Sequence, residues 1–108
     1  MPNVTIYIPA DRMPPDEALV DLTERCTDLC TGILRAALEN VHIVYVAIRH
    51  GRGHPAFAEI QYRFEPFRTP RIMDRFMEEL DDAIRRNTGL IPRIRCFGNE
   101  ASNIHARN

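Results

Sequence analysis

The chain has 108 residues, which is enough for one compact domain with a modest hydrophobic core. Its 14 basic and 15 acidic residues nearly cancel, so no overall field directs the protein to nucleic acid. Every basic residue in that count is an arginine, and the lack of lysine excludes Schiff-base chemistry on a lysine. No apolar run is long enough to span a membrane and the start lacks the pattern of a signal peptide, so we expect a cytoplasmic protein.

The first half of the chain predicts a strand, a helix and a second strand. Residues 4–8 are short and rich in β-branched and aromatic side chains, which is typical of a strand. Residues 17–38 predict an amphipathic helix capped by Asp16, because apolar residues recur at spacings of three and four: Leu19, Leu22, Cys26, Leu29, Ile33 and Ala37. The near-continuous apolar run 41–48 predicts the next strand.

The second half repeats this order. Residues 56–64 alternate in hydropathy as a strand does, Thr69-Pro70 is typical of a helix start, and Gly89 is typical of a helix end. Residues 91–97 predict a fourth strand, followed by a polar tail. The fold class is therefore α+β, a single domain over 1–108 with the order βαββαβ. Right-handed crossovers place both helices on one face of a four-stranded sheet.

An internal repeat relates the two halves, about 1–55 and 56–108. A shift of 56 positions places Val4 on Ile60 and Arg12 on Arg68, just before each predicted helix. If a pseudo-twofold axis relates the halves, the first and third strands run antiparallel. Arg68 then approaches the start of the first strand, whereas Arg12 lies roughly 20 Å from it, because a strand rises about 3.3 Å per residue. Arg12 should instead approach Ala58, in a second site that has no proline.

Pro2 stands at the first position of the predicted first strand. Proline is tolerated there because it has no N–H to donate to a sheet, so a purely structural role is one interpretation. The other is that removal of Met1 exposes Pro2 as a free secondary amine. An α-amino group normally titrates near about 8. Burial and a nearby guanidinium both lower the pKa of an amine, which leaves it uncharged and basic near neutral pH.

The sheet face away from the helices carries mostly polar side chains: Thr5, Tyr7, Glu59, Gln61, Arg63, Arg93 and Arg95. A small sheet that is open on one side needs a cover, so we expect a homo-oligomer whose sheets surround a polar centre. The three cysteines lack the spacing of a disulfide framework and are expected to be buried. His50 and His54 are too few for a metal site, and no metal or cofactor is expected.

The opening PNVTIYIPADR resembles the first strand of the tautomerase superfamily, with proline first and arginine ten residues later. The doubled βαβ unit, His54-Pro55-Ala56-Phe57, Arg68 and the tail segment 102–105 are similar to the longer members of this superfamily. The resemblance implies a trimer with sites between subunits. It also implies a tautomerase that moves a proton between carbon and the enol oxygen of a 2-hydroxy-dienoate or 2-oxo-enoate acid.

By matched position, the resemblance implies that Pro2 is the base and that Arg68 and Arg12 bind the carboxylate substrate. His42 stands where members often have arginine, and Arg93 and Arg95 lie on the strand that reaches a neighbour's site in longer members. Two alternatives remain. A ferredoxin-like module that binds small ligands also has the order βαββαβ. A protein with the tautomerase fold could also lack catalysis.

Overall fold

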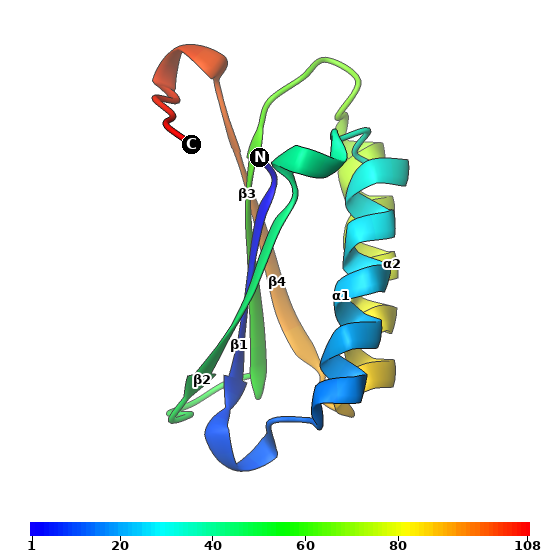
Figure 1. Cartoon of the computed structure of the whole chain (residues 1–108), viewed down its shortest axis with the longest axis vertical. Helices are drawn as coiled ribbons and strands as arrows, with labels where there is room; N and C mark the ends of the chain where they lie inside the picture. Colours follow the sequence, from blue (N-terminus) through cyan, green and yellow to red (C-terminus); the bar gives the residue numbers. More distant parts are fainter.

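The computed structural model describes all of residues 1–108 and has the predicted element order. One sheet contains β1 (Asn3–Pro9), β2 (His42–Ile48), β3 (Ala56–Arg63) and β4 (Pro92–Asn99). The helices α1 (Asp16–Gly32) and α2 (Pro70–Thr88) lie side by side on one face of this sheet, as predicted, and leave the other face open (Figure 1). Neither helix has the length and hydropathy that a membrane span requires.

The sheet has the order β2-β1-β3-β4. Within each half the two strands are parallel neighbours, and β1 and β3 join the halves as an antiparallel pair, as the repeat predicted. A ferredoxin-like sheet is a split βαβ arrangement, in which another strand lies between the two strands of a unit. Here β1 and β2 are direct neighbours, so the ferredoxin-like alternative is wrong.

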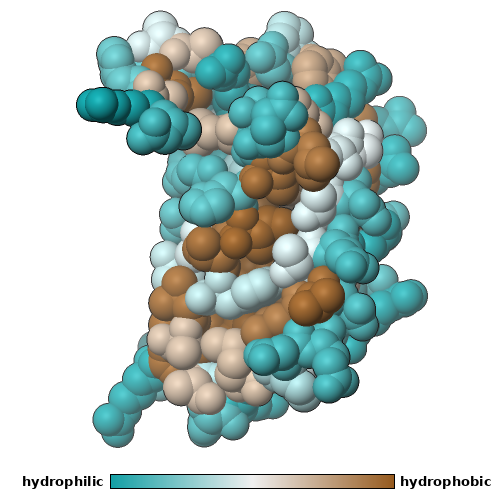
Figure 2. All heavy atoms as spheres, viewed as in Figure 1, coloured by the Kyte–Doolittle hydropathy of each residue, from teal (hydrophilic) through white to brown (hydrophobic).

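The core lies between the sheet and the helices. The alternate residues Val4, Ile6 and Ile8 of β1 point into it, and α2 contributes Phe76 and Leu80. The predicted cysteine burial is confirmed for Cys26 and Cys30, while Cys96 is half-buried. Figure 2 shows hydrophobic side chains along the seam between the sheet and helix layers, with hydrophilic ones on the outer helix surface.

The predicted limits of α2 are confirmed. Thr69 is its N-cap, and its Oγ1 accepts a hydrogen bond from the backbone N of Ile72 at 3.3 Å. Gly89 ends the helix with a φ of 72°, a left-handed conformation that favours glycine.

The predicted limits of α1 are wrong at both ends. Asp16 does not cap the helix, because it is already the first helical residue and follows Pro15. The helix ends at Gly32 rather than near residue 38, since the chain turns at Arg35, whose φ is 56°. The backbone N of Ala36 donates to the carbonyl of Cys30 at 3.0 Å, which closes this turn. Left-handed backbone cannot continue a right-handed helix.

The open face is less polar than expected. β2 is an edge strand, and it exposes Val44 and Val46 on this face, together with Phe97 of β4. Tyr7 and Phe57 stack on neighbouring strands, with ring centroids 5.8 Å apart. The predicted face named side chains of the first, third and fourth strands only, so it left out the residues of β2, and it did not include Phe97.

The repeat has a different offset from the predicted one. α1 begins at Asp16 and α2 at Pro70, which are 54 positions apart. The same offset places Val4 on Ala58 and Ile6 on Ile60, and all four are buried. Ala56, rather than Ala58, is therefore the structural counterpart of Pro2. The pairing by 56 positions followed the match of Arg12 to Arg68, which the fold does not preserve.

Candidate functional site

A cleft of about 1150 Å³ opens where β1 begins, and Met1 and Asn3 are among the residues that line it. Pro2 lies between them and is fully buried. The carbonyl of Pro2 accepts a hydrogen bond from the backbone N of His42 at 3.1 Å, which fixes the start of β1 against β2. While Met1 is attached, the Pro2 nitrogen is part of a peptide bond and has no basic lone pair.

The C-terminal tail forms one wall of this cleft. The tail leaves β4, passes through a short 3-10 helix at Ala101–Asn103 and ends near the N-terminus (Figure 1). Figure 2 shows it as a hydrophilic overhang above the open face of the sheet. Ile104 and His105 are among the tail residues that line the cleft.

Arg68 lines the cleft and is held rigidly. Its side chain is the one charged group buried in this chain. Its Nε donates to the carbonyl of Leu34 at 2.9 Å, and a terminal nitrogen donates to the carbonyl of Arg63 at 2.6 Å. The guanidinium also lies over the ring of Phe67, 5.2 Å from its centroid. The other terminal nitrogen has no protein acceptor, so it can bind an anion.

Two further arginines belong to the cleft. Arg63 ends β3 on the open face, and Arg35 reaches the cleft from the turn after α1, where its guanidinium lies 5.1 Å from the centroid of Phe67. Sequence analysis named Arg63 only as part of the open face and missed Arg35. It placed Arg35 inside a helix, and no sequence signal marked the turn that moves this side chain into the cleft.

The amino terminus at this cleft has a lowered pKa. Partial burial of the Met1 amine is the main cause, and the positive charges of Arg63 and then Arg68 lower the pKa further. An amine at this position is therefore easier to deprotonate than an ordinary α-amino group.

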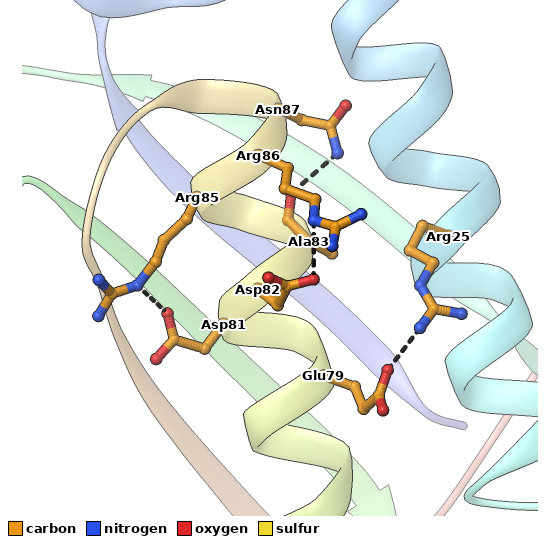
Figure 3. Close-up of polar contacts among 8 residues, drawn as sticks. All are labelled: Arg25, Glu79, Asp81, Asp82, Ala83, Arg85, Arg86 and Asn87. Carbon is orange, nitrogen blue, oxygen red and sulfur yellow. Dashed lines mark hydrogen bonds and ion pairs between the residues drawn. The ribbon is translucent and has the colours of Figure 1, made fainter.

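The cleft has an excess of positive charge. Four arginines line it, Arg107 of the tail among them, whereas its acidic side chains are Glu39 and Glu65. None of these arginines forms an ion pair. The ion pairs of this chain lie on the outer helix surface, where Arg25 of α1 binds Glu79 of α2 and two further pairs join residues within α2 (Figure 3). Unpaired guanidinium groups suit a carboxylate ligand.

The structure gathers only part of the predicted site. Arg68 and His42 line the cleft, and Pro2 lies buried between Met1 and Asn3, which line it too. Arg12 follows the far end of β1 in a 3-10 turn and does not line it. Arg93 and Arg95 line a second cleft toward the opposite end of the sheet. Within one chain these three arginines do not reach Pro2.

Comparison with known proteins identifies the fold. No protein-family model matches the chain, and no curated protein matches it in sequence. Solved structures do match over almost its full length, and they share one architecture: the chain has the fold of the tautomerase superfamily.

Three of these structures illustrate the similarity. Macrophage migration inhibitory factor of Toxoplasma gondii has a TM-score of 0.78 at 15% identity, covering 97% of this chain and 96% of that one. A fused 4-OT, a symmetric trimer, has a TM-score of 0.80 at 15% identity, covering 99% and 93%. Malonate semialdehyde decarboxylase has a TM-score of 0.74 at 10% identity, covering 99% and 92%.

Proposed function

We propose that this protein is a cofactor-independent tautomerase of 2-hydroxy-dienoate or 2-oxo-enoate acids, with Pro2 as its base after removal of Met1. The observation that carries the proposal is the position of Pro2, buried between Met1 and Asn3, which line a cleft that also contains unpaired arginines. The comparisons support it, since the fold belongs mostly to enzymes. The malonate semialdehyde decarboxylase structures include a mutant in which proline at position one is alanine.

The reaction needs one group that carries a proton. The Pro2 nitrogen, uncharged at the start, takes the proton from the enol hydroxyl, and the electron pair of that O–H bond forms the carbonyl. The electron pair of the C=C π bond forms the new C–H bond with the proton that the Pro2 ammonium gives back. Atoms and charge balance, and the base is regenerated. An amine with a lowered pKa suits both steps, because near neutral pH it can accept the proton in the first step and donate it in the second.

The arginines bind the acid. Arg68 is fixed by two backbone carbonyls, so its free nitrogen is pre-oriented toward the carboxylate or the developing enolate. Arg63 and Arg35 add positive charge to the same cleft. His42 lies at the same cleft and can donate a further hydrogen bond to the acid. In the proposed homotrimer, Arg12, Arg93 or Arg95 of a neighbour completes the site.

Replacement of Pro2 tests the proposal. We expect Pro2→Ala to slow the ketonisation of phenylenolpyruvate by about 100-fold or more, which is the lower range for loss of a general base. Pro15→Ala is the matched control, because Pro15 is exposed just before α1 and away from the cleft. Intact mass spectrometry must show that Met1 is absent from the active protein.

A protein of this fold without catalysis is the second candidate. Retention of Met1 would give a protein of this kind, since an acylated Pro2 nitrogen cannot act as a base. A purified protein that retains Met1 and has no activity on a panel of enol acids would establish this candidate. Unchanged activity in Pro2→Ala would also contradict our proposal, because the base would then be another group.

A further inference from the structure

The peptide bond between Met1 and Pro2 is enclosed by the folded chain. The side chain of Pro2 is fully buried, and Met1 is half-buried in the cleft that the C-terminal tail also lines. The carbonyl of Pro2 accepts a hydrogen bond from the backbone N of His42 at 3.1 Å. The chain on the far side of the Met1–Pro2 bond is therefore already fixed to the sheet.

The strand that follows this bond is an interior strand. Asn3 pairs with His42 of β2 on one side and with Gln61 of β3 on the other. Val4 comes next and is 1% exposed, packed in the core. Most domains have a loose amino terminus, but a terminal segment that is part of a sheet is tied down. Here the sheet begins only two residues after the first residue of the chain.

Removal of Met1 is a hydrolysis at this enclosed bond. The oxygen of water joins the carbonyl carbon of Met1, the C–N bond breaks, and a proton from water goes to the Pro2 nitrogen. An aminopeptidase must take up the free amine, the Met1 side chain and the backbone just beyond the bond. Enzymes cleave folded chains through transiently opened forms. Opening here gives up the hydrogen bond from His42, the pairing of Asn3 and the burial of Pro2.

We infer that Met1 is removed only before the start of β1 has folded, so that the state of the Pro2 site is fixed while each chain is made. A chain that folds with Met1 attached keeps it, and its Pro2 nitrogen stays part of a peptide bond. This inference describes the regulation of the proposed site and rests on the proposed function, because Met1 controls activity only if Pro2 is the base.

Protein that retains Met1, made in cells whose methionine aminopeptidase is inhibited, tests this inference. Purified methionine aminopeptidase is added to the folded full-length protein in the assembly that it forms, and intact mass spectrometry follows the loss of Met1. The peptide MPNVTIYIPADR has the same first bond without the fold. We expect the folded protein to lose Met1 at least about 100-fold more slowly than this peptide. A smaller difference would overturn the inference.

A chain with Ala-Gly-Ser-Gly inserted between Met1 and Pro2 is the matched control. Its first peptide bond stands clear of the sheet, while the residues from Pro2 onward are unchanged. We expect it to lose Met1 about as fast as the peptide does, although it is folded. Slow loss of Met1 from this chain would also overturn the inference, because the enclosure of Pro2 would then not be the cause.

The mass measurement separates this inference from the proposed activity. Rapid loss of Met1 from the folded protein would overturn the inference and leave Pro2 available as the base. Slow loss of Met1, together with ketonisation of phenylenolpyruvate by the protein that still carries it, would support the inference and contradict the proposed function.

Discussion

Arg68 shows how one residue can serve the fold and the site together. Its two hydrogen bonds to the carbonyls of Leu34 and Arg63 join the turn after α1 to the end of β3. A buried charge is tolerated only when it is hydrogen-bonded, and these carbonyls meet that need. The same bonds orient the free end of the guanidinium near the amino terminus. Sequence predicted this proximity from the duplication, but it could not predict the backbone partners.

Arg63 gives a cleaner test of the electrostatics than Arg68, because its side chain is exposed and makes no hydrogen bond of its own. We expect Arg63→Gln to raise the pKa of the Pro2 amine, since removal of a nearby positive charge stabilises the protonated form. Only the neutral amine is active, so the acid limb of the kcat/KM profile should move to higher pH. Arg71→Gln should leave that limb in place, and an unmoved limb in Arg63→Gln would contradict the electrostatic part of the proposal.

At the scale of elements, the sequence predicted all four strands and both helices, because their hydropathy periods are strong. It failed where the backbone turns. Nothing in ILRAALEN showed that Arg35 adopts a left-handed conformation, so α1 was extended too far and Arg35 was lost from the site. The open face was also misjudged, since the expected polar face named no residue of β2 and so left out the exposed Val44 and Val46.

Gly98 of β4 tests the packing that holds the two strands of the second half together. A Cβ added there would lie 2.9 Å from the ring carbon Cζ of Tyr62, its partner on β3. We expect Gly98→Ala to lower the free energy of unfolding by about 1–3 kcal/mol through overpacking. Gly32→Ala is the control, because nothing lies within 4 Å of its added Cβ. Equal stability of both variants in urea would contradict this account.

At the scale of the whole molecule, duplication explains why one chain carries two clefts at opposite ends of one sheet. The duplication was visible in the sequence, because the order of strands and helices survives divergence better than individual arginines do. The predicted offset of 56 positions was two residues too long, since it followed the match of Arg12 to Arg68. The cleft could be predicted in part: Arg68 and His42 line it, as do Met1 and Asn3 on either side of Pro2 in the chain. Arg12, Arg93 and Arg95 lie outside this cleft, and we expect one of them to reach it from a neighbouring subunit.

The open face is where we expect subunits to meet. The fused 4-OT of the same fold is a trimer, and this face exposes Val44 at 38% of its surface. We expect the protein to sediment at three times its 12.5 kDa chain mass. Val44→Glu should shift it toward monomer, because the charge would be buried between subunits. Val20→Glu, on a valine 55% exposed on α1, should remain a trimer, and equal behaviour of the two would contradict this assembly.

The central claim is that the Pro2 nitrogen is a free amine whose pKa lies below that of an ordinary α-amino group. Protein labelled with ¹⁵N-proline allows this nitrogen to be titrated directly by NMR, once mass spectrometry has shown that Met1 is gone. We predict a pKa below the usual value of about 8, because burial and the guanidiniums of Arg63 and Arg68 lower the pKa of the Met1 amine, one residue earlier in the chain. A pKa at or above that value, or a nitrogen that does not titrate because Met1 remains attached, would contradict the account.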